Sequence, residues 1–269
     1  MSELDSSICI SSVRATAEQL AGLASSENIA APNPLVTALA VRKLGNVETD
    51  RTVLYNPDAV ALWLYQKYTD MFTEAALCSD LALPMLSVMP SVTPVCFASM
   101  YTGVMPEVHG IRKYEKPVLK CETLFDAFLA SGKRVAIVST AGDSISKIFL
   151  EREMSYYIYG SVSEVNQKAL ELIDEDRFDL IVIYNGNYDG TMHKHGTESP
   201  AALEALRQNV AFYAELVEKI RVCWKQHTVF YGFCPDHGCH EIDAECGSHG
   251  LDMPEDMNVI HFYGIKAAE

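Results

Sequence analysis

Residues 178–185 read FDLIVIYN, an apolar run of strand length without polar alternation. A strand that is apolar on both faces is typical of the interior of a parallel sheet, because helices cover both sides of such a sheet. Similar runs occur at 52–55, 134–140 and 228–234, and longer amphipathic stretches separate them. We therefore predict an α/β fold, a three-layer sandwich with a largely parallel central sheet covered by helices on both faces.

Helices are expected between these strands and within residues 1–50. Asn33 before Pro34 and Ser199 before Pro200 are typical helix starts, because the first residue accepts a backbone N–H and proline fits the first turn. The expected helices cover residues 12–26, 34–44, 59–72, 123–131, 163–173 and 200–226, and further extended segments cover 84–89 and 258–265.

The composition favours one globular domain. The 269 residues are 49% hydrophobic and 21% charged, which provides enough apolar material for a large core. We predict a single domain over residues 1–269, with residues 1–50 as a helical N-terminal segment packed on it. The eight cysteines are scattered through a chain too large to need disulfides, so we expect reduced thiols and a cytoplasmic protein.

The charge limits the class of partner. A formal net charge of −15 argues against a nucleic-acid polymer or an anionic membrane as the main partner. No apolar run approaches the ~20 residues of a membrane span, and the N-terminus lacks the pattern of a secretory signal. A small phosphorylated partner is still compatible, because bound metal cations can outweigh a diffuse negative surface. The sequence does not indicate an oligomeric state.

Acidic and histidine side chains follow several of the expected strands at the point where each strand ends. Because the carboxyl ends of parallel strands meet at one edge of a sheet, these side chains should lie close together. Carboxylates and neutral imidazoles bind zinc, and also manganese or iron where oxygen ligands dominate. Six such residues are enough for two ions. The candidates are Asp58, Asp189, His193, Asp236, His237 and His249, all expected near strand ends and none in the middle of a helix.

Each candidate also has a structural interpretation. Asp58 could be a helix N-cap, and Asp189 and His193, four residues apart, could share a helical face without binding an ion. The DHG sequence at 236–238 could be an ordinary turn. A different zinc site is conceivable at Cys234, Cys239 and Cys246, although their spacing is not that of paired zinc cysteines.

Five motifs occur in a characteristic order. They are PSVTPVCFASMYTG at 90–103, VMPEVHGI at 104–111, DGTMHKHG at 189–196, PDHG at 235–238 and GSHG at 247–250. Together with the aspartate after the first strand, they resemble the alkaline phosphatase superfamily, and most closely its type I phosphodiesterase and nucleotide pyrophosphatase branch. The resemblance runs from about residue 52 to the C-terminus.

The resemblance implies a metal-dependent hydrolase of phosphoric esters with Thr93 as nucleophile and two divalent ions, most simply zinc, with manganese or another divalent ion as an alternative. It assigns Asp58, Asp236 and His237 to one ion, which also contacts Thr93. The ligands of the other ion would be Asp189, His193 and His249. His195 is not a ligand in this assignment, and His109 would be structural.

The sequence departs from the family pattern in four places. Cys96 stands where relatives often carry an asparagine that contacts the phosphate, so that contact should be lost or made by another group. Pro94 follows Thr93 directly, one position earlier than usual. Asp58 lies in NPDAV instead of a DG turn, and the chain is too short for the large insertions of bigger relatives. These departures bear on whether the substrate is a nucleotide more than on whether the metal site is present.

Several functions are compatible with these motifs. Within the superfamily, a phosphomonoesterase, a phosphonate hydrolase or a phosphomutase is an alternative, whereas a sulfatase would need a C-x-P-x-R type motif that is missing here. From a different class, a non-catalytic metal-binding protein could keep the same fold. The presence of Thr93 and of all six candidate ligands favours the enzyme.

Overall fold

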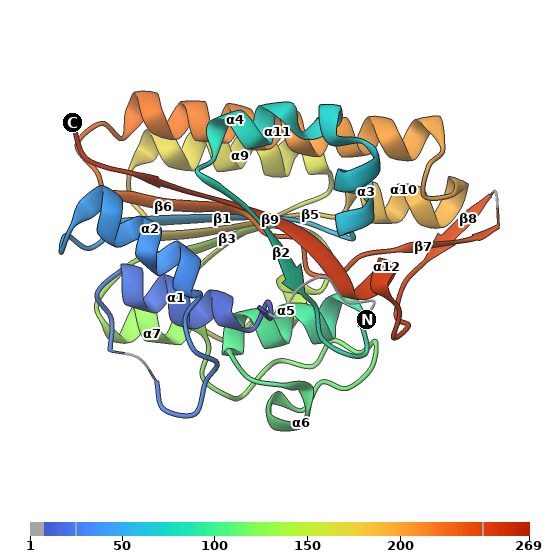
Figure 1. Ribbon diagram of the computed structural model, residues 1–269. Coiled ribbons are helices and arrows are strands. Elements are labelled where there is room, and N and C mark those ends of the chain that lie inside the picture. The colour runs from blue at the N-terminus through green and yellow to red at the C-terminus, as the bar shows by residue number, and fades with distance from the viewer. Residues whose placement is uncertain (1–7, 25, 244) are drawn as a thin grey trace.

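A seven-stranded sheet forms the middle layer of the computed structural model, which describes residues 8–24, 26–243 and 245–269 (Figure 1). The strand order is β2-β9-β6-β1-β5-β3-β4, and only β9 runs against its neighbours. The strands are β1 (Arg51–Pro57), β2 (Leu81–Leu86), β3 (Val135–Thr140), β4 (Ser155–Tyr159), β5 (Leu180–Asn185), β6 (Val229–Phe233) and β9 (Asn258–Lys266). The predicted, largely parallel sheet is confirmed.

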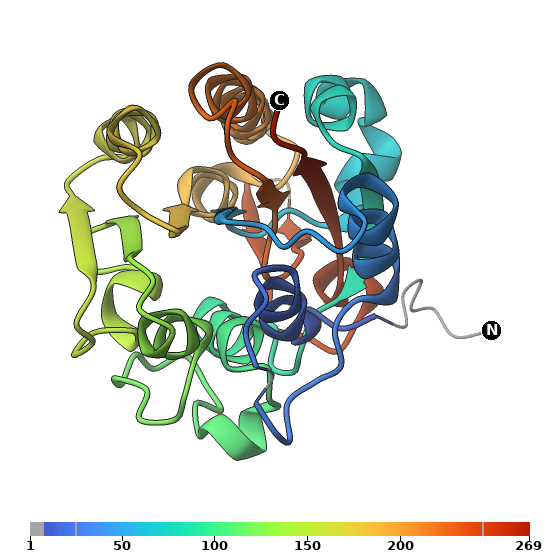
Figure 2. The ribbon, with the colours of Figure 1, turned by 90° about the vertical axis from the view of Figure 1, so that its left-hand side faces the viewer.

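Helices cover both faces of this sheet, as Figure 2 shows from one end of the strands. One face packs against α3 (Leu62–Lys67), α4 (Thr73–Cys78), α9 (Val162–Glu175), α10 (Asn187–His195) and α11 (Pro200–Cys223). The other packs against α1 (Ser12–Leu20), α2 (Pro34–Leu44), α5 (Thr93–Thr102), α7 (Leu124–Ala130) and α8 (Ile145–Ile148). The remaining short elements are η1 (Thr69–Phe72), α6 (Pro106–His109), α12 (Pro254–Met257), β7 (His240–Asp243) and β8 (Cys246–Ser248).

Local signals explain several of these elements. Every residue of β5 is buried, as expected of an apolar strand at the centre of a parallel sheet. Asn33 accepts the backbone N–H groups of Leu35 and Val36 and so caps α2, and Ser199 accepts that of Ala202 at the start of α11.

The predicted helix over 59–72 is wrong in detail. Ala59 takes a left-handed conformation with φ of 65°, and Ala61 pairs with Val259, so α3 begins only at Leu62. The helical path is interrupted again at Tyr68, and η1 follows. The sequence pattern indicated neither β4 nor the hairpin of β7 and β8.

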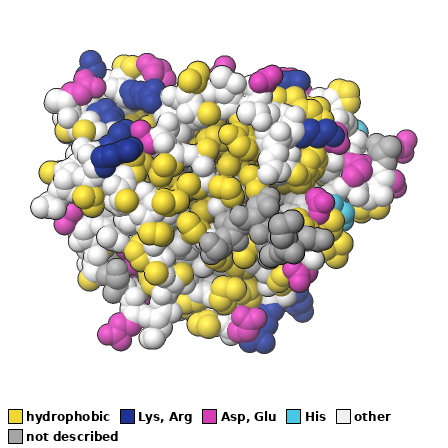
Figure 3. Space-filling view, in the orientation of Figure 1, with side chains coloured by type: hydrophobic (Ala, Val, Ile, Leu, Met, Phe, Trp, Pro, Cys, Tyr) yellow, Lys and Arg dark blue, Asp and Glu magenta, His cyan; other side chains and the backbone are white. Residues whose placement is uncertain are grey.

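Apolar side chains gather in the middle of the face shown in Figure 3, while most acidic and basic side chains lie at its margin. The exposed apolar residues of the protein include Leu35 and Val41 on α2 and Leu77 on α4. No helix in the described ranges is both long and apolar enough to cross a membrane.

Arg14 joins α1 to the rest of the structure from a buried position. Its Nε lies 2.6 Å from Oε1 of Glu18, and its Nη1 donates to the carbonyl groups of Thr102 and Glu122 at 2.9 Å each. Because Thr102 ends α5, this side chain ties the N-terminal segment to the helix that begins at Thr93. The single-domain organisation stays a prediction, which this contact makes testable.

Arg14→Met should lower the free energy of unfolding by about 3–5 kcal/mol, because it leaves the buried carboxylate of Glu18 without its partner. Chemical denaturation monitored by fluorescence would measure the change. As a matched control, Arg207→Met removes an exposed arginine that pairs with Glu204 and should change stability by less than about 0.5 kcal/mol. Separate unfolding of residues 1–50 from the remainder would contradict the single-domain prediction.

Candidate metal centre and nucleophile

The carboxyl ends of β1, β5 and β6 meet at the side of the molecule where α10 and α12 lie (Figure 1). In the sheet register, Pro57 lies beside Asn185 and Tyr55 beside Phe233. The segments that follow these three strands therefore leave the sheet next to one another. They carry five of the six predicted ligands.

Asp58, Asp236 and His237 form a buried cluster directly after β1 and β6. All three residues are 0% exposed. The Nε2 atom of His237 lies 3.2 Å from Oδ1 of Asp58 and 3.4 Å from Oδ2 of Asp236. One oxygen or nitrogen from each side chain lies within 4.8 Å of the others, a spacing at which the three could hold one metal ion.

Asp189, His193 and His249 form a second cluster that is more open to solvent. Oδ1 of Asp189 lies 3.2 Å from Nε2 of His193 and 3.5 Å from Nε2 of His249. The side chain of His193 is 38% exposed. The expectation that no candidate lies in the middle of a helix is wrong for His193, because α10 begins at Asn187 and carries both Asp189 and His193. Their four-residue spacing places them on one face of that helix.

The two clusters are adjacent, and Thr93 lies beside the buried one. The rings of His237 and His249 stack with their centroids 4.0 Å apart. The hydroxyl oxygen of Thr93 is 3.4 Å from Oδ2 of Asp58 and 3.2 Å from Nε2 of His237. Thr93 is the first residue of α5, so the positive end of that helix points toward the same region.

Backbone carbonyl groups orient all three histidines. Nδ1 of His237 faces the carbonyl oxygen of Gly238, that of His193 faces Gly247, and that of His249 faces Ser91, each at 2.9 Å. A carbonyl oxygen only accepts hydrogen bonds, so each Nδ1 carries the proton. In the neutral imidazole each Nε2 then presents a lone pair to the clusters, the usual arrangement of histidine ligands.

The carboxylates of both clusters have oxygens without a hydrogen-bond partner among the described residues. They are Oδ1 of Asp58, Oδ1 of Asp189 and both oxygens of Asp236. Burial and the charge of Asp189 raise the pKa of Asp58 to about 6, and burial with the charge of Asp58 raises the pKa of Asp236 well above its usual range. Unpartnered buried carboxylates next to unprotonated imidazole nitrogens fit divalent cations.

Tyr184 belongs to this site although the sequence analysis did not identify it. Its hydroxyl donates a hydrogen bond of 2.5 Å to Oδ2 of Asp58, which leaves Oδ1 of Asp58 turned toward His237. Tyr184 lies in the apolar run of β5, and its spacing from the motifs carries no signal. Only the pairing of β5 with β1 brings it next to Asp58.

Cys96 does not replace the phosphate-contacting asparagine of the relatives. It is 0% exposed, and its sulfur lies 3.2 Å from the hydroxyl oxygen of Ser87. Burial raises the pKa of this thiol well above its usual range. The side chain is therefore part of the packing behind the first turn of α5.

The other histidines and cysteines named in the sequence analysis lie outside the two clusters. His109 is held by Ser99 and by the N–H of Ile111, as a structural residue would be, and His195 is exposed at the end of α10. All eight cysteines are free, and no potential metal group in the described part of the chain contains one. The structure thus gives no support to a zinc site at Cys234, Cys239 and Cys246.

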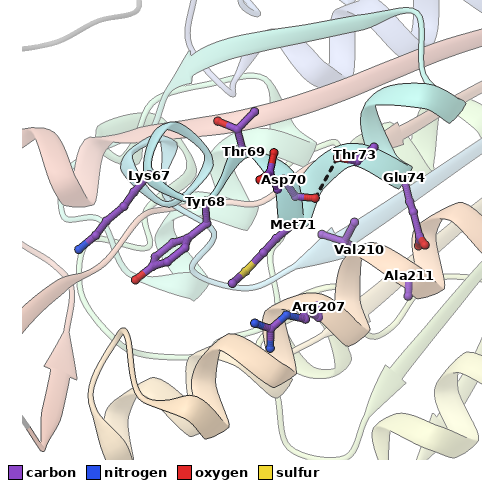
Figure 4. Close-up of a pocket in the computed structure, with 10 residues that line it drawn as sticks. All are labelled: Lys67, Tyr68, Thr69, Asp70, Met71, Thr73, Glu74, Arg207, Val210 and Ala211. Atoms are coloured by element: carbon purple, nitrogen blue, oxygen red, sulfur yellow. Dashed lines mark hydrogen bonds between the residues drawn. The ribbon is translucent and has the colours of Figure 1, made fainter.

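A wide surface groove lies elsewhere, between η1 and α11 (Figure 4). It has a volume of about 790 Å³ and is lined by residues that include Lys67, Tyr68, Met71 and Arg207. No residue of either cluster lines it. The chemistry of the metal centre therefore lies away from this groove, at the carboxyl edge of the sheet.

Residues 56–121 match the family model of the type I phosphodiesterases and nucleotide pyrophosphatases. The chain resembles this family. The matched range contains Asp58 and Thr93, and it confirms the resemblance to hydrolases of phosphoric esters that the motifs predict. Among curated proteins, no sequence matches the chain.

Solved structures with the same fold include three relatives of low sequence identity. Human ectonucleotide pyrophosphatase/phosphodiesterase 5 has a TM-score of 0.64 at 12% identity, covering 80% of this chain and 87% of its own. An inactive threonine-to-alanine variant of the murine protein, in complex with AMP, has a TM-score of 0.60 at 13% identity, with coverages of 81% and 88%. Phosphonoacetate hydrolase from Sinorhizobium meliloti, in complex with phosphonoformate, has a TM-score of 0.56 at 18% identity, with coverages of 74% and 59%. These similarities confirm the predicted fold.

Proposed function

We propose that this protein is a metal-dependent hydrolase of phosphoric esters with Thr93 as nucleophile. The observation that carries the proposal is the position of the Thr93 hydroxyl, at the start of α5 and within 3.4 Å of Asp58 and His237. Asp58, Asp236 and His237 would hold one divalent ion near that hydroxyl. A second ion would be held by Asp189, His193 and His249.

Three imidazole nitrogens and three carboxylates suit zinc best, with manganese as the alternative. Two divalent ions, when bound, would supply the positive charge that lowers the pKa of a hydroxyl and neutralises phosphoryl oxygens. The Thr93 oxygen would then bond to phosphorus as the ester bond to the leaving group breaks, and water would hydrolyse the phosphothreonine. The positive end of the α5 dipole would stabilise the phosphoryl oxygens. Pro94 carries no N–H, and the N–H groups of Val95 and Cys96 already donate to the Val92 carbonyl.

The substrate that we propose is a small phosphate ester, in the first instance a diester or nucleotide. The family match supports a diesterase, and the AMP complex of the murine relative is consistent with a nucleotide. A phosphonate hydrolase is the second candidate, because the bacterial neighbour acts on phosphonoacetate. The free cysteines are consistent with a reducing, cytoplasmic location, and the net charge of −15 disfavours a nucleic-acid polymer as partner.

A paired assay tests this function. Purified protein loaded with zinc, manganese or magnesium is given a bis-aryl phosphodiester, an aryl monoester and phosphonoacetate in parallel. We expect the diester to be cleaved fastest with zinc. Preference for the monoester or for phosphonoacetate would reassign the substrate class, and absence of turnover with every metal would favour the non-catalytic alternative.

A further inference from the structure

Three consecutive carbonyl groups after β6 are each held by a buried side-chain donor from a different part of the fold. The Cys234 carbonyl accepts from Nδ2 of Asn56 at 2.7 Å, and the Pro235 carbonyl accepts from Nε2 of His261 at 2.7 Å. The Asp236 carbonyl accepts from the Ser87 hydroxyl at 2.6 Å. These carbonyl groups lead directly to Asp236 and His237, the two residues of the buried cluster that follow β6.

The topology explains two of these contacts. At the end of β6, Phe233 pairs with Tyr55 on one side and with Phe262 on the other. β1 therefore continues past the end of β6 to Asn56, and β9 passes the same point at His261. The chain that leaves β6 runs between two longer strands, where side-chain donors replace the missing sheet hydrogen bonds.

Each donor is in turn fixed by a second buried group. The Tyr101 hydroxyl donates to Oδ1 of Asn56 at 2.5 Å, and the Tyr263 hydroxyl donates to Nδ1 of His261 at 2.7 Å. Ser87 uses its only proton on the Asp236 carbonyl, and its hydroxyl oxygen lies 3.2 Å from the sulfur of Cys96. Asn56 and His261 are 0% exposed and Ser87 is 2% exposed, so solvent does not compete for these carbonyl groups.

We propose that Asn56, Ser87 and His261 are positioning residues that fix the path of residues 234–236 and thereby hold Asp236 and His237 in the geometry of the buried ion site. The inference rests on the proposed function and adds to it three residues outside the ligand motifs. It also gives Cys96 a role, because that thiol links the first turn of α5 to the Asp236 backbone through Ser87.

Zinc binding to the full chain tests the proposal. Ser87→Ala and His261→Leu should each lower the affinity for one of the two zinc ions by about 10- to 100-fold in a competition titration with a chromogenic chelator. The affinity for the other ion should not change. His261→Gln, which keeps an N–H donor near the position of Nε2, should restore much of the affinity. Ser99→Ala is the matched control, since it also removes one buried hydroxyl, which pairs with His109 away from both clusters.

A second measurement does not depend on metal. Amide hydrogen exchange of residues 234–238 in metal-free protein should speed up in Ser87→Ala and His261→Leu but not in Ser99→Ala. Unchanged amide exchange of residues 234–238 in Ser87→Ala and His261→Leu would overturn the positioning role. So would an equal loss of affinity for both ions, if the unfolding midpoint fell by the same amount as in Ser99→Ala. If the unaltered protein bound no zinc, the proposed function would fail, and exchange alone would still decide whether these donors hold the loop.

Discussion

Thr93→Ala is expected to lower turnover of the preferred ester by about four orders of magnitude or more, since it removes the proposed attacking oxygen. The fold should survive. The Thr93 hydroxyl does not cap α5, and its contacts with Asp58 and His237 are long, at 3.4 and 3.2 Å. Initial rates on the substrate selected by the paired assay, together with the thermal unfolding midpoint and zinc content, would measure both effects.

Two variants control this experiment. Thr93→Ser keeps a hydroxyl at the same place and should retain measurable activity. Thr102→Ala removes a buried threonine hydroxyl at the opposite end of the same helix, where it donates to the Ala98 carbonyl and accepts from the N–H of Val104. That variant should lose some stability and little activity. A Thr93→Ala protein that retains the normal rate would remove Thr93 from the mechanism.

Asp236→Asn is expected to have opposite effects on the metal-free and the metal-bound protein. In metal-free protein at neutral pH it should raise the free energy of unfolding by about 1–3 kcal/mol, because it removes a buried carboxyl that is costly to ionise and whose two oxygens have no hydrogen-bond partner among the described residues. In the presence of zinc it should lose the ion of the buried cluster, much of the stabilisation by zinc, and the activity. Thermal unfolding with chelator and with zinc would show the change of sign.

The stabilisation of the metal-free protein by Asp236→Asn should depend on pH, because the pKa of Asp236 is raised in the folded state. A carboxyl whose pKa is higher in the folded than in the unfolded state favours folding at acid pH, and this contribution is lost as the pH rises through the folded-state pKa. The advantage of Asp236→Asn should therefore be largest at neutral pH and disappear near pH ~4, where the carboxyl is protonated in the folded protein.

Asp143→Asn provides the matched control. The carboxylate of Asp143 is also largely buried, but it accepts hydrogen bonds from Ser139, Thr140 and the N–H of Ser146. Replacing it should destabilise the metal-free protein, because an amide cannot accept all of these bonds. If Asp236→Asn destabilised the metal-free protein as much as Asp143→Asn does, the Asp236 carboxylate would not be a buried group without a hydrogen-bond partner.

Much of the fold follows from local patterns in the sequence. The run at 178–185 could be predicted as a central strand because apolar residues on both faces suit only a strand covered on both sides. Asn33 and Ser199 predicted helix starts because an N-cap side chain interacts within its own turn. β4 escaped prediction because its pairing with β3, more than its own pattern, decides that it is a strand.

The site, like the fold, depends partly on local sequence patterns and partly on tertiary contacts. The sequence by itself indicated the candidate ligands, because they follow predictable strands whose carboxyl ends must meet, and the resemblance of its motifs added Thr93. Only the tertiary structure decided that Tyr184 donates to Asp58 and that Cys96 faces the interior. It also decided the donors to residues 234–236. The physical reason is that these contacts join strands far apart in the chain, and neither residue of such a pair carries a local signal of the other.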